Sequence, residues 1–151
     1  MQIKDGFTVE APPDTVWAFI HDIPRVSACV PGAAGVAETE PDVYAGKLTA
    51  KVGAVRAAFT GQATITERVV PERLSASFKA DDRALASSVT GTFTVQVTAV
   101  EAGTQVDYDI DVAMRGRLAQ IGFTAVQQTA KRLTAEFVKC LQATLLEGGA
   151  T

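Results

Sequence analysis

The chain has very few of the side chains on which most metal and nucleophilic sites depend. Its 151 residues include one histidine, His21, and two cysteines, Cys29 and Cys140. A zinc site needs several such ligands at short spacings, so no metal site is predicted. We expect His21 to lie at the surface at the end of a helix. Two cysteines do not make a disulfide framework, and we expect each to be a buried, small apolar residue.

The chain also lacks a strong charge excess and a long apolar run. Fourteen basic and seventeen acidic residues give a net charge of −3. Nucleic-acid-binding domains usually carry a basic excess, so we expect no nucleic-acid partner. No stretch approaches the roughly 20 apolar residues that span a bilayer, and the first residues lack the apolar segment of a secretory signal. We therefore expect a cytoplasmic protein.

Sequence motifs for nucleotide binding and for nucleophilic catalysis are absent as well. The chain contains no P-loop, no dinucleotide fingerprint and no nucleophile elbow of the Gly-x-Ser-x-Gly type. We therefore expect no cofactor and no enzymatic activity.

Alternation of apolar and polar residues dominates the middle of the chain. Hydrophobic residues make up 47% and charged residues 21% of the sequence, as in ordinary globular proteins, and the length fits a single domain over residues 1–151. Between residues 36 and 115 apolar residues recur at every second position, for example at Val106, Tyr108, Ile110 and Val112. A period of two predicts antiparallel strands with one dry face. Short turns, at residues 53–54, 70–72, 81–82 and 102–103, connect them into a meander.

Two other regions have the period of a helix. The stretch Pro12-Pro13-Asp14 is a helix start signal, and it predicts a short helix that ends or bends at Pro24, with a second short turn over residues 25–29. From Leu118 to about residue 147, apolar residues recur three or four positions apart, which predicts one long C-terminal helix.

Small residues occupy many positions on the facing sides of the predicted sheet and helix. On the strands they are Gly46, Ala50, Ala57, Gly61, Ala63, Ala76, Ala80, Ser87 and Gly91, and on the helix they are Gly122 and Ala130. An apolar void costs about 24 cal/mol per Å³, so we interpret a large one as a ligand cavity. In the alternative, the sheet and the helix approach closely and the small residues pack tightly.

Four stretches of the sequence resemble one known family. They are residues 12–20, residues 28–33 (Ala-Cys-Val-Pro-Gly-Ala), residues 44–53, and residues 116–122 (Gly-Arg-Leu-Ala-Gln-Ile-Gly). Together with the order of elements, they resemble the CoxG family of carbon monoxide dehydrogenase subunits, which belongs to the START-like, or SRPBCC, superfamily. The resemblance implies an α+β helix-grip fold. In that fold a seven-stranded antiparallel sheet curves around the long C-terminal helix, and two short helices follow the first strand.

The same resemblance implies a function. Members of the family are accessory proteins of carbon monoxide dehydrogenase-type molybdenum hydroxylases, associated with bringing the enzyme to the membrane quinone pool. Superfamily members bind lipids and other hydrophobic molecules in an apolar cavity. We therefore expect a non-catalytic protein that binds an apolar small molecule, either a lipid or an isoprenoid quinone. We also expect such a hydroxylase as a partner, and a peripheral position at the inner face of the cytoplasmic membrane.

Two sets of site residues follow from the helix-grip arrangement. Those predicted to line the ligand cavity are Phe59, Phe78, Phe93, Tyr108, Ile110, Met114, Val126 and Phe137, with the Tyr108 hydroxyl orienting the ligand. Those predicted to frame the cavity mouth are Pro31, Gly32, Gly53, Arg115, Arg117 and Gly122. The two arginines are placed to attract anionic head groups.

Two other functions stay open at this point. The chain is an adaptor that binds proteins through its surface if its interior is solidly packed. It is an enzyme acting on a hydrophobic substrate if a buried aspartate, glutamate or histidine points into the cavity.

Overall fold

A seven-stranded antiparallel sheet forms most of the molecule. The computed structural model describes residues 1–149. The strands are β1 (Gln2–Val9), β2 (Ala33–Glu40), β3 (Val43–Val52), β4 (Val55–Val69), β5 (Arg73–Asp82), β6 (Ser87–Val100) and β7 (Gly103–Arg115). They lie side by side in the order β1-β7-β6-β5-β4-β3-β2. The predicted meander is confirmed, with β1 closing the sheet against β7.

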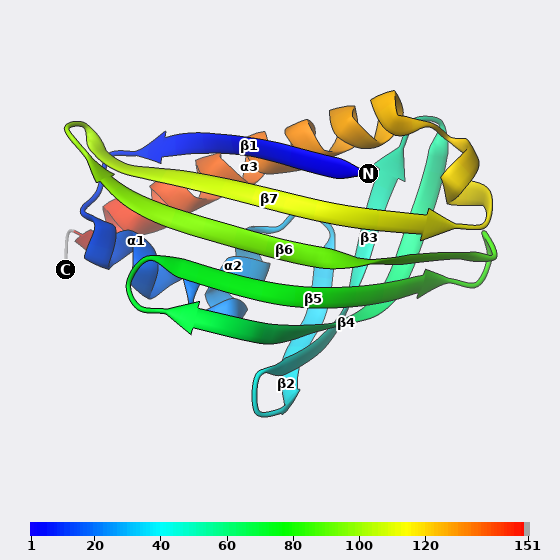
Figure 1. The fold of residues 1–151 in the computed structure, drawn as a ribbon, viewed down its shortest axis with the longest axis horizontal. Helices are drawn as coiled ribbons and strands as arrows, with labels where there is room; N and C mark the ends of the chain where they lie inside the picture. Colours follow the sequence, from blue (N-terminus) through cyan, green and yellow to red (C-terminus); the bar gives the residue numbers. More distant parts are fainter. Residues whose placement is uncertain (150–151) are drawn as a thin grey trace.

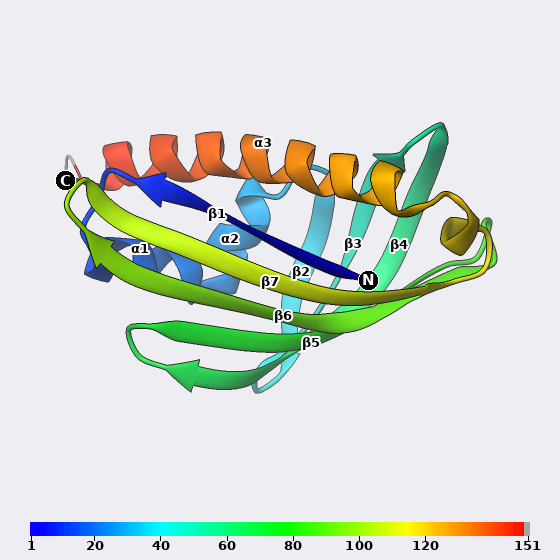
Figure 2. The ribbon, with the colours of Figure 1, turned by 45° about the horizontal axis from the view of Figure 1, so that its top comes forward.

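The sheet bends around one long helix, α3 (Phe123–Gly149). In Figure 1, β2 and β3 cross the direction of β5, β6 and β7, so the sheet turns strongly between its two ends. Figure 2 shows α3 lying across the open side of this curve, and α1 (Pro13–Ile20) and α2 (Ile23–Cys29) lie on the same side. This is the helix-grip arrangement that the resemblance implied.

The period of two correctly separates the faces of the strands. On β6, Val95 and Val97 are buried while Gln96 between them is exposed, and on β7 the buried Val106 and Tyr108 flank the exposed Asp107. Successive Cβ atoms point to opposite sides of a strand, so the apolar set faces α3 and the polar set faces solvent.

The two short helices follow one another with almost no linker. The Asp22 side chain accepts a hydrogen bond from the Arg25 amide at 3.4 Å and caps the start of α2. Pro24 therefore lies in the first turn of α2, where a proline costs nothing because that amide has no helical partner. The prediction that the first helix ends or bends at Pro24 was wrong, since α1 already ends at Ile20 and Pro24 belongs to α2.

The long helix begins later than its apolar period predicted. Leu118 belongs to a separate 3-10 turn, η1 (Arg117–Gln120), and α3 starts only at Phe123. Gly122 between them has φ +99°, a left-handed conformation that breaks the helix. Leu118 shares the spacing of the apolar residues of α3 because it is also buried, packed against Val52 and Ala57 at this end of the sheet.

The buried interior is divided into two clusters. The larger contains α1, the C-terminal half of α3 and the inner faces of β5, β6 and β7; its largest fully buried side chains include Phe19 and Leu141. The smaller surrounds Leu118 at the opposite end of the sheet. Ile23 and Val26 pack against the first cluster, and Phe59 and Val89 pack against the second. These four residues all border the space between the clusters.

Candidate functional site

A cavity of about 410 Å³ lies between the two clusters, open to solvent on one side. Its walls come from α2 and its C-terminal cap, from the edge strand β2, and from strands β3 to β6. The lining residues are Ile23, Val26, Ser27, Val30, Ala33, Val36, Tyr44, Ala45, Gly46, Lys47, Leu48, Phe59, Gly61, Gln62, Ala63, Phe78, Lys79, Ala80 and Val89. The lining surface is almost wholly apolar.

The floor of the cavity is one row of small residues across the sheet. Gly46 pairs with Gly61, Gly61 pairs with Ala80, and Ala80 pairs with Val89. A Cβ atom added at Gly61 would lie only 2.8 Å from the Cβ atom of Ala80, so the row is already closely spaced along the sheet. The free space therefore lies above the row, because these side chains are too short to fill it.

Larger side chains stand in the neighbouring rows and form the sides of the cavity. One row contains Tyr44, Ala63 and Phe78, and the other contains Leu48 paired with Phe59. A Cβ atom added at Gly91 would lie 2.7 Å from Cζ of Phe78, so the glycine leaves room for that ring. A trough with a small-residue floor and bulky sides suits an elongated apolar molecule.

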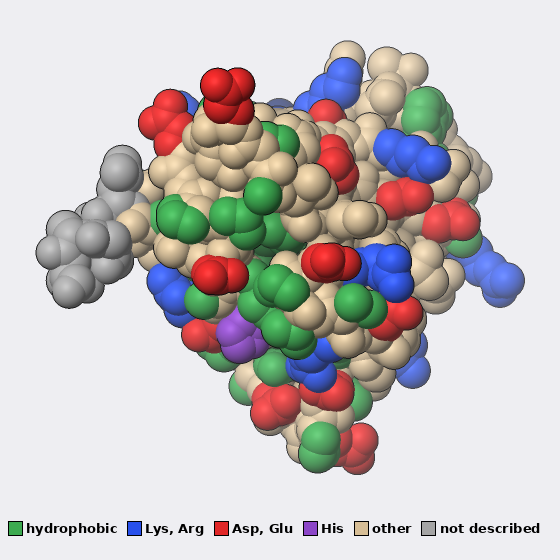
Figure 3. Space-filling view, turned by 60° about the vertical axis from the view of Figure 1, so that its left-hand side comes forward, with side chains coloured by type: hydrophobic (Ala, Val, Ile, Leu, Met, Phe, Trp, Pro, Cys, Tyr) green, Lys and Arg blue, Asp and Glu red, His purple; other side chains and the backbone are tan. Residues whose placement is uncertain are grey.

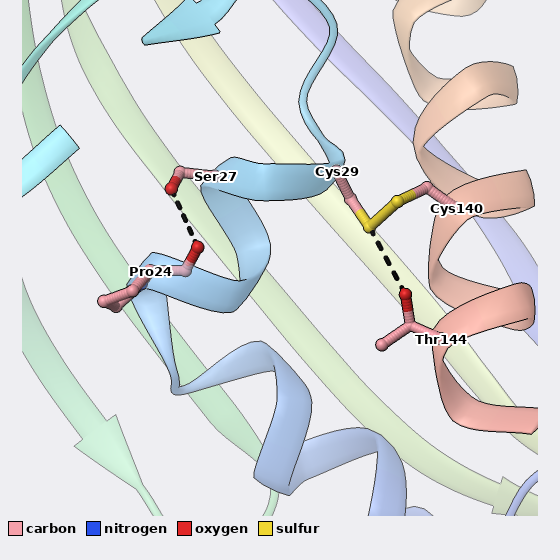
Figure 4. The surroundings of a disulfide bond; sticks show 5 residues. All are labelled: Pro24, Ser27, Cys29, Cys140 and Thr144. Carbon is pink, nitrogen blue, oxygen red and sulfur yellow. Dashed lines mark hydrogen bonds between the residues drawn. A yellow bond between two sulfur atoms is a disulfide. The ribbon is translucent and has the colours of Figure 1, made fainter. Parts of the chain in front are cut away.

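Helix α2 covers the trough and is covalently tied to α3. Cys29 at the end of α2 forms a disulfide with Cys140 of α3, with the two Cα atoms 5.4 Å apart (Figure 4). Thr144, one turn further along α3, approaches the Cys29 sulfur at 3.8 Å. The expectation that both cysteines act only as small apolar residues was wrong. Their positions are 111 residues apart in the sequence, and only the packing of α2 on α3 brings them together.

Polar residues lie next to the lining residue Tyr44, where β2, β3 and β4 meet, and of these only Tyr44 itself lines the cavity. Glu38 pairs directly with Tyr44 across the two strands, and the Arg68 guanidinium lies 2.7 Å from the Asp42 carboxylate. The hydrogen bond to Arg68 lowers the pKa of Asp42. Burial and the neighbouring Glu38 raise the pKa of the Tyr44 hydroxyl, so it stays protonated at neutral pH. We call Glu38, Asp42, Tyr44 and Arg68 the polar end.

Comparison with known proteins supports the same architecture. Residues 6–146 match the sequence profile of the CoxG family of carbon monoxide dehydrogenase subunits. The chain belongs to the CoxG family. No curated protein sequence matches it.

Several solved structures share the fold at low sequence identity. A conserved protein from Geobacillus kaustophilus is 19% identical with a TM-score of 0.88, and the alignment covers 97% of this chain and 96% of that one. A START superfamily protein from Mycobacterium smegmatis is 10% identical with a TM-score of 0.71, covering 97% of each chain. The Zhui aromatase/cyclase from Streptomyces sp. R1128 is 14% identical with a TM-score of 0.64, covering 96% of this chain and 93% of that one. They establish that this CoxG-family chain has a START-like fold.

Two of the eight predicted lining residues, Phe59 and Phe78, line the cavity of this CoxG-family chain. Phe93 and Tyr108 instead stack on each other with ring centroids 6.3 Å apart. The Tyr108 hydroxyl lies 2.8 Å from the Thr134 hydroxyl of α3. That hydroxyl therefore ties the sheet to the helix rather than facing the trough.

The other predicted lining residues also lie in the contact between the sheet and α3. Phe137 packs against Phe19 of α1 at 6.2 Å between ring centroids. Met114 and Val126 pack around Leu118, and Ile110 pairs with Ile3 of β1 on the inner face. None of these side chains lines the cavity, which lies beside α2 instead. A ligand role for this set stays a prediction.

The predicted mouth residues fall into two groups. Gly53 lies at the start of α3, because a Cβ atom there would be 3.6 Å from Ala125 and from Ile121. Arg115, Arg117 and Gly122 are exposed at the same end of the sheet. Pro31 and Gly32 lie elsewhere, between Val30 and Ala33, which both line the cavity. Only this second group adjoins the trough, and a mouth role for either group stays a prediction.

Sequence reasoning missed two parts of the site. The first is α2, whose apolar residues Ile23 and Val26 are three positions apart and so share one side of the helix, with Val30 following as its C-terminal cap. The second is the polar end, which depends on irregularities of the strands. The signal for α2 was present in the sequence. For the β2 irregularity the signal is Gly35, which lies between Ala34 and Ala37 with φ +63°, because a glycine inside a strand often marks a bulge.

The buried aspartate Asp82 and the histidine His21 both have structural partners. Asp82 is the one charged residue that is buried within the described part of the chain. Its carboxylate accepts hydrogen bonds from the Ala58 amide at 2.7 Å and from the Leu85 amide at 3.1 Å, and these bonds lower its pKa. His21 caps the end of α1 and stacks on Trp17, and it lies at the molecular surface (Figure 3). Neither side chain lines the cavity.

No helix within residues 1–149 combines the length and the apolar character needed to cross a membrane.

Proposed function

We propose that this CoxG-family protein holds an apolar ligand in the trough between α2 and strands β3 to β6 without acting on it chemically. The observation that supports this most strongly is the cavity of about 410 Å³ with an almost wholly apolar lining. Its volume lies in the range of about 300–1,000 Å³ that small-molecule sites occupy.

The energetics favour occupation of the trough. A dry, closed cavity of 410 Å³ would cost about 10 kcal/mol at 24 cal/mol per Å³. This cavity is open, so water reduces that cost but gains few hydrogen bonds from an apolar lining. An alkyl chain of ten methylene groups would gain about 8 kcal/mol on burial, which sets a limiting Kd of about 1 μM.

The ligand class and the partner rest on the family. We propose a lipid or an isoprenoid quinone as ligand, because both present a long apolar chain that matches an elongated trough. The family takes its name from carbon monoxide dehydrogenase. We therefore propose that the protein recruits or couples a molybdenum hydroxylase of that type to the quinone pool. That role requires a cytoplasmic location with peripheral contact at the inner face of the membrane.

The two alternative functions have less support. An adaptor that acts through its surface alone needs no cavity in its interior. An enzyme needs a reactive group facing its substrate, and the one buried carboxylate of the described chain, Asp82, is occupied by two backbone amides. The fold itself does not decide this point, since a structural neighbour is named an aromatase/cyclase.

Native mass spectrometry with lipid extraction tests the proposal on protein purified from its own host. We expect a fraction of the protein to carry an apolar molecule that denaturation releases, and we expect purified quinone to bind in a titration. Ligand-free protein, together with no quinone binding, would contradict the proposal.

A separate measurement tests the coupling role. The rate at which the partner hydroxylase reduces quinone in vesicles should rise when this protein is added. An unchanged rate would remove the coupling role and leave ligand binding in place.

A further inference from the structure

The concave face of the sheet changes character along its length. Around Gly46, Gly61 and Ala80 it is apolar, and beyond Tyr44 it becomes charged. The polar end lies on this face because Tyr44 both lines the cavity and pairs with Glu38. Lys47 and Lys79 also border the cavity, but they alternate with the inward-facing Gly46 and Ala80 and are exposed, so their side chains point to the outer face of the sheet. On the inner face, charged side chains therefore lie only beyond Tyr44.

Two β-bulges create this change. On β2 the pairing shifts between Ala34 and Ala37, and on β4 it shifts between Ile65 and Glu67. Each extra residue reverses the alternation, so that Glu38 joins the face of Tyr44 and Arg68 joins the face of the buried Leu74. Without the bulges both charged side chains would point to the outer, solvated face.

The charges at this end already neutralise part of one another. Arg68 is held by Asp42 at 2.7 Å, so its positive charge is not free to pair with a ligand. Glu38 accepts a hydrogen bond from the Asp42 amide at 3.1 Å and remains a second carboxylate beside Tyr44. Two carboxylates against one guanidinium leave a net negative charge, which repels an anionic head group.

Hydrogen-bonding capacity remains available there. The Tyr44 hydroxyl, whose proton faces Glu38, can still accept a hydrogen bond, the Glu38 carboxylate accepts, and the guanidinium has more N–H groups than its contact with Asp42 uses. These groups suit a head that is polar and uncharged.

We propose that the polar end selects ligands with a neutral, hydrogen-bonding head, a hydroxyl or a carbonyl, whose apolar chain extends along the trough. It also discriminates against carboxylate and phosphate heads. This inference rests on the proposed ligand-binding function and adds to it the class of ligand.

Paired ligands of equal chain length test the selection. Binding of 1-decanol and of decanoate is measured at pH 8 by displacement of the neutral fluorophore N-phenyl-1-naphthylamine. We expect 1-decanol to bind about tenfold more tightly than decanoate, the effect of a nearby negative charge at intermediate dielectric. Replacing Glu38→Gln should reduce this ratio about fivefold. Glu101→Gln makes the same charge change at the exposed β6–β7 turn and should leave the ratio unchanged.

Tyr44→Phe separates the contribution of the ligand's head group to binding from that of its alkyl chain. It keeps the ring that lines the trough and removes only the hydroxyl. We expect it to weaken 1-decanol about fivefold, the effect of one hydrogen bond, and to leave displacement by the hydrocarbon 1-decene unchanged.

The outcomes distinguish the two proposals. Equal binding of 1-decanol and decanoate, tighter binding of decanoate, or a ratio insensitive to Glu38→Gln overturns the head-group inference while ligand binding stands. Failure of the fluorophore, 1-decanol and 1-decene to bind overturns the proposed function, and the inference with it.

Discussion

Replacing Ala80 by leucine should block the trough from its floor. Ala80 lies on the inner face of β5, between Gly61 on β4 and Val89 on β6, and its methyl group borders the cavity. A leucine there projects three further carbon atoms into the space that the ligand is proposed to fill. The strand pairing is kept, because the backbone of β5 needs no special conformation at this position.

The size of the effect follows from the volume that is lost. Three carbon atoms exclude about three methylene groups of a bound chain, each contributing about 0.8 kcal/mol on burial. Ala80→Leu should therefore weaken binding by about 2.4 kcal/mol, or about 50-fold in Kd. The protein itself should be as stable as the wild type or slightly more stable, since the added side chain covers apolar surface that is otherwise wet.

Fluorescence titration with N-phenyl-1-naphthylamine measures this change, and 1-decanol serves as competitor. Ala113→Leu is the matched control, because it adds the same three carbons on the exposed outer face of β7. We expect the control to bind like the wild type. Thermal unfolding of both variants separates a filled trough from a damaged sheet.

One pattern of results would refute the reasoning. If Ala80→Leu folds with an unchanged Tm and binds the fluorophore as tightly as Ala113→Leu does, the ligand lies outside the trough. Binding under α3, near the residues that the sequence predicted, would then be the better explanation.

Three other perturbations test the framework around the trough. Replacing Cys29 and Cys140 by serine, or adding a thiol reductant, should lower the free energy of unfolding in urea by about 4 to 5 kcal/mol, the chain-entropy value for a loop closed over 111 residues; equal stability of the oxidised and reduced forms would argue against the bond. The pKa of Asp82 is lower in the folded protein than the value of 3.8 in the unfolded chain. Its carboxylate therefore stabilises the fold at pH values above 3.8, and this contribution is lost as the pH falls through the folded-state pKa. Asp82→Asn should therefore lower Tm at pH 7, with a difference from the wild type that shrinks as the pH falls below 3.8; a difference that stays constant with pH would contradict the assignment. Tyr108→Phe should cost about 1 kcal/mol in urea unfolding through the lost contact with Thr134 and leave ligand affinity unchanged, whereas weaker binding would place the ligand under α3.

The strands and the long helix were predictable because each buries one face. The period of two in β6 and β7, and the period of three to four in α3, both follow from side-chain direction in a regular element. Such patterns lie within one element, so they can be recognised without knowing which elements pack against it. The family resemblance then supplied the way in which the sheet curves.

The position of the cavity was not predictable in the same way. Tyr108 and Phe137 have the size expected of ligand contacts. In the structure, however, the Tyr108 hydroxyl contacts the Thr134 hydroxyl, and the Phe137 ring packs against Phe19. Both partners are distant in the sequence. The space that stays open depends on the register that aligns Gly46, Gly61 and Ala80. Register is set by the turns and by irregularities within strand pairs, so the alternation of a single strand does not determine it.

The disulfide and the polar end were missed for related reasons. Cys29 and Cys140 are joined only after α2 has packed on α3. Strict alternation assigns Glu38 and Arg68 to the solvated face, and the two bulges reverse that assignment. Each depends on contacts between elements rather than on the residues of one element.

A crystal structure of the protein with 12-bromo-1-dodecanol tests the central claim most directly, because the anomalous signal of bromine locates the end of the chain. We expect the alkyl chain to lie between α2 and strands β3 to β6, with its hydroxyl beside Tyr44 and the bromine at the other end of the small-residue floor. Bromine located beneath α3 near Phe137, or no bound molecule at saturating concentration, would contradict this claim.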